Sequence, residues 1–178
     1  MHGKNSTKTV LRTAAACVAV LVCVMLQITV FPYLRFFGGI PDITAACLIC
    51  LSLFENEKTV CLLAVFSGVV LHSLGTWGIS YYPLLYLLAV CLCLILSNFF
   101  FKNGFLSVMT AAFCTFIAEG ILTAVFLMSD GAAYTDAFTG AVLPQFAYSL
   151  VCTAVLYPLC RLHGAVFGMR RKTDYYEE

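Results

Sequence analysis

Charged residues are scarce in this sequence. Only 11% of its 178 residues are Asp, Glu, Lys or Arg, whereas 62% are hydrophobic and the mean hydropathy is +0.96. Soluble domains contain about 25% charged residues, and a water-soluble core of this size cannot hide so many apolar side chains. The net charge of +1 leaves no basic face for nucleic acid. The composition therefore excludes an ordinary soluble protein and predicts an integral membrane protein.

Catalytic and metal-binding patterns are also missing. The sequence has no HExxH, no GxSxG, no phosphate-binding loop and no paired-Asp signature, so we expect no catalytic residues, no cofactor and no enzymatic activity. Cys47 and Cys50 have the spacing of half a zinc site, but no second pair of ligands follows at a usable distance, and we expect no metal. All ten cysteines fall in apolar segments, where they serve as small hydrophobes.

Long apolar runs organise the chain. A helix needs about 20 apolar residues to cross about 30 Å of hydrocarbon. We predict one all-α membrane domain over residues 1–178, with spans at 13–31, 42–54, 59–74, 81–101, 105–128 and 137–162. The second span is short, so it forms either a true crossing or a re-entrant hairpin with the third, which gives six crossings or four. Both counts keep the two termini on the same side.

Basic residues distinguish these topologies. With the N-terminus in the cytoplasm and six crossings, nine of the ten Lys and Arg residues fall inside, and only Arg35 falls outside. A re-entrant hairpin would instead leave Lys58 on the outer side. The distribution favours a six-span bundle with cytoplasmic N- and C-termini.

A few polar side chains interrupt the spans. Counted at about 1.5 Å per residue, Gln27, His72 and Glu119 lie at a common depth in the outer half of the membrane, and Gln145 and Tyr148 enter the last span from the outer side. An ionisable group in a span usually faces a partner or a wet cavity, so Glu119 marks a candidate binding site. Hydrogen bonding between helices is the leading interpretation, with a pocket for a small molecule or partner, and catalysis, as alternatives.

Short motifs surround the second and third spans. Residues 26–32 read LQITVFP, residues 40–43 read IPDI with Asp42 placed to cap the next helix, and residues 66–72 read FSGVVLH before Leu74-Gly75. This series resembles the opening of the MreD family of rod-shape-determining proteins. The structural loop signature comprises Pro32, Pro41, Asp42, Gly68 and Gly75. One departure is His72, because the family commonly has an acidic residue there.

The resemblance implies a function. MreD-like proteins are non-enzymatic scaffolds in the bacterial cytoplasmic membrane, within the complex that maintains cell shape and lateral peptidoglycan synthesis. Their implied partners are MreC and also MreB, RodA and a class B penicillin-binding protein, with the lipid bilayer around them. The six-helix plan is also similar to the substrate-binding S-components of energy-coupling-factor vitamin transporters. That similarity supplies the alternative, in which the polar residues of the outer half hold a vitamin.

Overall fold

The computed structural model describes residues 3–34, 39–74, 82–99, 104–129, 131, 133, 135 and 138–166. Its elements are α1 (Gly3–Thr29), α2 (Ile43–Ser52), α3 (Glu57–Leu74), α4 (Tyr82–Phe99), α5 (Gly104–Ser129), the π-helical turn η1 (Phe138–Val142) and α7 (Leu143–Val166). Within these ranges the chain contains no β-strand. The prediction of an all-α bundle is confirmed, and a helix occupies each of the six predicted segments.

Four stretches are long and apolar enough to cross a membrane: Val10–Thr29, Glu57–Leu74, Gly104–Ser129 and Phe138–Val166. The helix α2 and the stretch Tyr82–Ser97 are apolar but shorter. Large apolar side chains cover the outside of the bundle, for example Leu62 at 72% and Val155 at 60% exposure. Such a surface is stable against lipid but not against water. The chain is thus a helical membrane protein.

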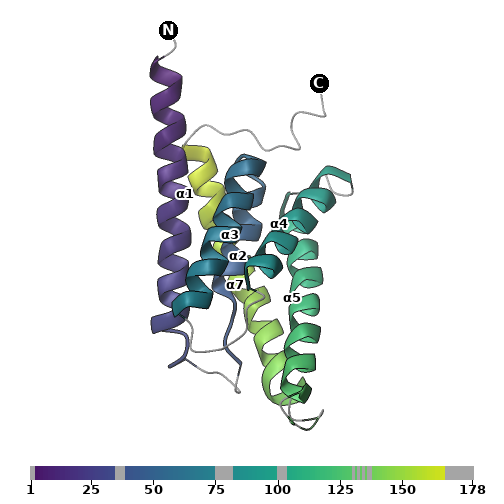
Figure 1. The fold of residues 1–178 in the computed structure, drawn as a ribbon. Coiled ribbons are helices and arrows are strands. Elements are labelled where there is room, and N and C mark those ends of the chain that lie inside the picture. Colours follow the sequence, from purple (N-terminus) through teal and green to yellow (C-terminus); the bar gives the residue numbers. More distant parts are fainter. Residues whose placement is uncertain are drawn as a thin grey trace.

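Successive helices run in alternating directions, with α1 and α5 at opposite edges of the view in Figure 1. The beginning of α1, the turn after α2 and the end of α7 lie at the same end of the bundle, because Glu55 contacts both Arg12 and His163. We refer to it as the terminal end. A turn at Glu55 on the same side as Arg12 is the arrangement that the six-span prediction requires of this loop.

Helix α2 lies at the centre of the bundle. All ten of its residues are buried, and it packs against α1, α3, α4, α5 and α7. Ten residues extend only about 15 Å, roughly half of the hydrocarbon thickness. In lipid, helices gain little free energy of association from burying apolar surface, so their contact depends on close packing. The small side chains of Ala45, Ala46, Cys47 and Cys50 allow such packing around α2. The short predicted span is therefore a core helix, enclosed by longer helices.

The close approach of α3 and α4 depends on Gly68. A Cβ atom at this position would lie 2.4 Å from the Cα atom of Pro83 and 2.9 Å from the carbonyl carbon of Tyr82. These are backbone atoms at the beginning of α4, which cannot move aside as a flexible side chain can. Gly68 thus allows the two helices to touch, as small residues do in membrane bundles.

Candidate functional site

The buried end of α2 is capped by Asp42. Its side chain accepts a hydrogen bond from the Ala45 amide, with 2.8 Å between Oδ1 and N, which confirms the predicted cap. Asp42 is only 2% exposed. A helix beginning inside a membrane protein has amide groups that water cannot reach, so each needs a partner from the protein. The cap satisfies one of them.

Two further helices are joined to Asp42. The Tyr86 hydroxyl of α4 donates to both carboxylate oxygens, at 3.0 and 2.9 Å. The Asp42 backbone amide donates to Oγ of Ser149 on α7 at 2.8 Å. Both partner side chains are fully buried. Hydrogen bonds between charged and neutral groups are stronger than average, so these contacts fix the beginning of α2 against α4 and α7.

Gln27 joins α1 to the same place. Its Oε1 atom accepts from the backbone amide of Thr44 at 3.0 Å. The side chain thus satisfies a second amide at the beginning of α2. This hydrogen bond explains a Gln deep in an apolar span, because its side-chain oxygen has a partner on another helix.

Glu119 completes the network from α5. The Gln145 side-chain amide donates to Glu119 Oε1 at 2.7 Å. The Glu119 carboxyl group also lies close enough to Asp42 for the two groups to interact electrostatically. We call the six residues that meet here the Asp42 network: Gln27, Asp42, Tyr86, Glu119, Gln145 and Ser149.

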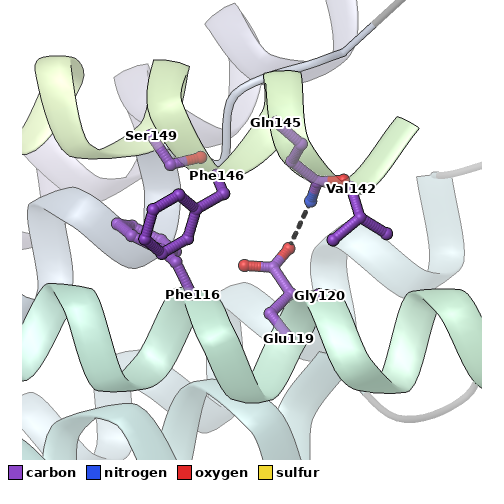
Figure 2. Close-up of a pocket in the computed structure, with 7 residues that line it drawn as sticks. All are labelled: Phe116, Glu119, Gly120, Val142, Gln145, Phe146 and Ser149. Carbon is purple, nitrogen blue, oxygen red and sulfur yellow. Dashed lines mark hydrogen bonds between the residues drawn. The ribbon is translucent and has the colours of Figure 1, made fainter. Parts of the chain in front are cut away.

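A small cavity adjoins the network. Figure 2 shows Glu119 rising from α5 toward Gln145 on α7, with Phe116 and Phe146 on one side and Val142 on the other. The side chains leave no room there for a water molecule, whereas pockets for small organic ligands measure about 300–1,000 Å³. Among the lining polar atoms, Gln145 Nε2, Glu119 Oε1 and Ser149 Oγ are hydrogen-bonded within the protein. The geometry is that of a joint between helices more than that of an open ligand site.

The structure brings together some of the predicted site residues and separates others. Gln27, Glu119 and Gln145 belong to the Asp42 network. His72 lies exposed near the end of α3, and Tyr148 is half-buried on α7 beside Ser149, which makes the contact to Asp42. Of the five predicted site residues, three therefore belong to the Asp42 network, and His72 and Tyr148 do not.

The loop signature is distributed in the same way. Pro32 lies in the turn that follows α1, and Pro41 is buried directly before the cap. Gly39, two residues earlier, contacts the beginning of α7 so closely that a Cβ atom on it would lie 2.5 Å from the backbone nitrogen of Gln145. Gly75 lies outside the described residues. The segment around Pro41 therefore packs tightly against the beginning of α7 just before it enters α2.

Tyr86 and Ser149 were missed by the reasoning from sequence. Tyrosine and serine are common in apolar helices and carry no charge, so neither stood out among its neighbours. For Ser149, the spacing from Gln145 could have indicated its place in the site. Ser149 lies one helical turn after Gln145, so the two residues share a face of α7.

The thiols of Cys47 and Cys50 meet two others across helices. Cys160 of α7 contacts both, and Cys23 of α1 contacts Cys47. All four are buried. Among the described residues, no three Cys, His, Asp or Glu side chains are placed to hold a metal ion together. The four thiols pack the seam where α1, α2 and α7 meet.

Fold and site together define a helical membrane protein whose central short helix is held by a buried carboxyl network. Searches of protein-family models, curated proteins and solved structures return no match to this chain.

Proposed function

We propose that this chain is a non-enzymatic membrane scaffold of the MreD kind, acting in the bacterial cell-wall elongation complex through helix contacts with MreC. The supporting observation is the position of Asp42. Residues 40–43, one of the motifs on which the resemblance rests, supply the residue that receives hydrogen bonds from α4 and whose backbone amide donates to α7. A signature residue with such a role preserves the shape of the whole bundle, as a scaffold requires.

The proposal includes a location and a topology. The chain lies in the bacterial cytoplasmic membrane, crosses it six times and has both termini in the cytoplasm. The contact of Arg12 and His163 with the turn after α2 supports a common side for these three segments, and the basic residues at the terminal end support the cytoplasm as that side. In this topology α2 and α4 cross as members of the bundle, enclosed or flanked by longer helices.

The exposed faces supply the means of contact. Apolar side chains on α1 and α7, among them Val18, Val22, Val151 and Val155, are 50–60% exposed. In a bilayer such faces meet either lipid or other helices, so a transmembrane partner such as the single span of MreC has suitable surfaces available. RodA, a class B penicillin-binding protein and MreB would join through the same complex.

Co-purification tests the proposal. The full chain with an affinity tag should retain MreC of the same organism from detergent-solubilised membranes, and depletion of the chain in a rod-shaped cell should produce round cells. We also expect its gene to lie beside those of MreC and MreB. Failure to retain MreC in mild detergent, together with normal shape after depletion, would refute the scaffold role.

The alternative is a vitamin-binding S-component. The buried polar groups of the outer half favour it, but the space that they line has no room for a water molecule, whereas a vitamin needs a pocket of several hundred Å³. Calorimetry with the purified protein and each B vitamin distinguishes the two functions. We expect no binding, and submicromolar affinity for any of them would establish uptake instead.

A further inference from the structure

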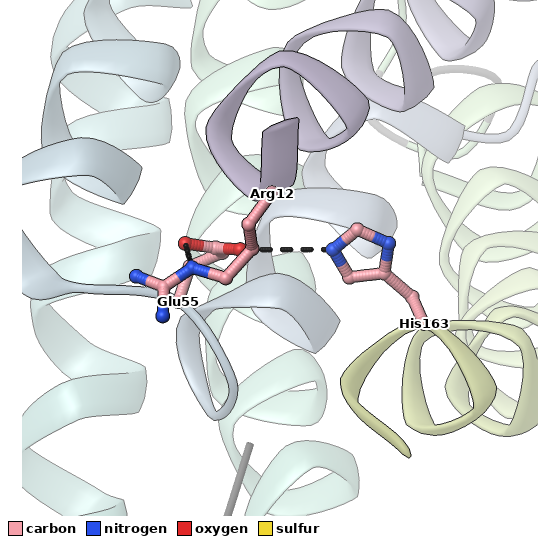
Figure 3. A network of polar contacts seen from close by, with 3 residues as sticks. All are labelled: Arg12, Glu55 and His163. Carbon is pink, nitrogen blue, oxygen red and sulfur yellow. Dashed lines mark ion pairs between the residues drawn. The ribbon is translucent and has the colours of Figure 1, made fainter. Parts of the chain in front are cut away.

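A second buried carboxylate lies at the terminal end of α2, away from the Asp42 network. The Glu55 side chain has no solvent exposure, and its Oε2 lies 3.1 Å from Nε of Arg12 on α1. Its Oε1 lies 3.6 Å from Nε2 of His163 on α7. Figure 3 shows the carboxylate between the two, with Arg12 and His163 approaching it from different helices. We call these three residues the clasp.

The clasp links α1 and α7, two helices that have few direct contacts with each other. Both α1 and α7 pack against α2, but the two are not among the closely packed helix pairs of the described chain. Near the clasp, the rings of Phe54 and Tyr157 lie 6.5 Å apart and hold α7 against the end of α2. Arg12 and His163 thus reach Glu55 from both sides of a seam, and Glu55 is the polar group that they share.

The carboxylate of Glu55 is only partly compensated. Neither oxygen accepts a hydrogen bond of good geometry from a described residue, so Arg12 acts on the carboxylate by charge attraction, and His163 does so when its imidazole is protonated. Burial of a carboxylate is costly, and pairs of imperfect geometry repay only part of that cost. The side chains of Arg12 and His163 remain 24% and 18% exposed, so water reaches both. Opening of this arrangement therefore costs little free energy, because the carboxylate regains its hydration.

We propose that the clasp is a two-state latch that controls opening of the seam between α1 and α7 at the terminal end. In the closed state, seen here, Arg12 and His163 hold both helices on Glu55. In the open state they separate from it, water reaches the carboxylate, and the thiols beneath become accessible. Cys160, only 7% exposed, precedes His163 by one helical turn and contacts Cys47 and Cys50, so it reports on opening.

Thiol labelling of the full chain in liposomes tests this proposal. The rate at which N-ethylmaleimide modifies Cys160 would be measured by peptide mass spectrometry and divided by the rate at Cys160 in the chain denatured in SDS. Arg12→Gln should raise this ratio by about tenfold or more, because it leaves the buried Glu55 carboxylate without its nearest cation. His163→Gln should raise the ratio by less, and so should Glu55→Gln, which removes the buried charge together with its attraction to both helices.

Arg161→Gln is the matched control. Arg161 is an exposed residue beside Cys160, so its replacement removes a charge at the same depth without touching the clasp. We expect its labelling ratio to equal that of the unmodified chain. The double variant Arg12→Gln/Glu55→Gln should be no faster than Glu55→Gln alone, because residues of one network are non-additive.

Two results would overturn the latch. One is an unchanged ratio in Arg12→Gln and His163→Gln. The other is an increase in Arg161→Gln as large as that in Arg12→Gln, which would make the effect one of general charge. If Glu55→Gln unfolds the protein, labelling also appears at Cys114, an exposed residue in the middle of α5 that faces lipid in the folded bundle, and Arg12→Gln and His163→Gln then decide the question.

Discussion

The hydroxyl group of Tyr86 lies 3.0 and 2.9 Å from the two carboxylate oxygens of Asp42, so a single side chain of α4 holds both acceptors at the beginning of α2. At the other end of this helix, Glu55 contacts α1 and α7. The central helix α2 therefore has a buried carboxyl group at each end, Asp42 and Glu55, about 20 Å apart by helical rise. The helix α2, which is shorter than its neighbours, is fixed in position at both of its ends.

Removal of the Tyr86 hydroxyl should weaken this fixation. In Tyr86→Phe the buried carboxylate loses its donor from α4, and a buried acceptor left without a partner costs about 1–3 kcal/mol. We expect thermal unfolding in detergent at a correspondingly lower temperature. Tyr33→Phe is the control, because Tyr33 is 88% exposed and its change should stay within about 0.5 kcal/mol. Equal effects of the two replacements would deny the hydroxyl this role.

Glu119 should tolerate Gln but not Leu. In Glu119→Gln the side-chain oxygen can still accept from the Gln145 amide, so stability should stay within about 1 kcal/mol of the original. Glu119→Leu leaves the Gln145 amide without its acceptor and should cost about 1–3 kcal/mol. Unfolding curves of the two variants provide the comparison. If both are tolerated equally, Glu119 contributes no interhelical hydrogen bond.

A methyl group at Gly68 should force α3 and α4 apart. Its Cβ would lie 2.4 Å from the Cα atom of Pro83, and overpacking of this kind costs about 1–3 kcal/mol. Gly140→Ala is a matched control, since a Cβ there meets nothing within 4 Å. We expect Gly68→Ala to lower the unfolding temperature well below that of Gly140→Ala. Similar unfolding temperatures would show that the two helices separate without cost.

The turn between α2 and α3 should lie on the same side of the membrane as the N-terminus. A protease site inserted at the exposed residue Asn56 should be cut only in inside-out vesicles, together with an N-terminal tag. The same site at Gly131, in the connection after α5, is the control and should be cut only from the opposite face. Cleavage at Asn56 from the outer face would establish the re-entrant hairpin and four crossings.

Composition and hydropathy alone determined that the chain is an all-α membrane protein, and they placed the six α-helices of at least ten residues in the described part of the chain. The reason is that lipid admits few solutions: backbone groups must bond within a helix, and apolar runs of sufficient length mark where this happens. The cap at Asp42 was equally predictable, because it depends only on the residues that follow it in the chain.

Only the tertiary structure decided which polar residues meet. Depth along a span can be counted from sequence, but the face of a helix that turns inward depends on packing against its neighbours. Hence His72 shares the predicted depth of Glu119 and yet points outward, while Tyr86 and Ser149 bind Asp42 from helices remote in sequence. Similarly, Arg12 counts only as one of the basic residues near the N-terminus, and His163 had no role in the reasoning from sequence. Only the fold places both beside the buried Glu55.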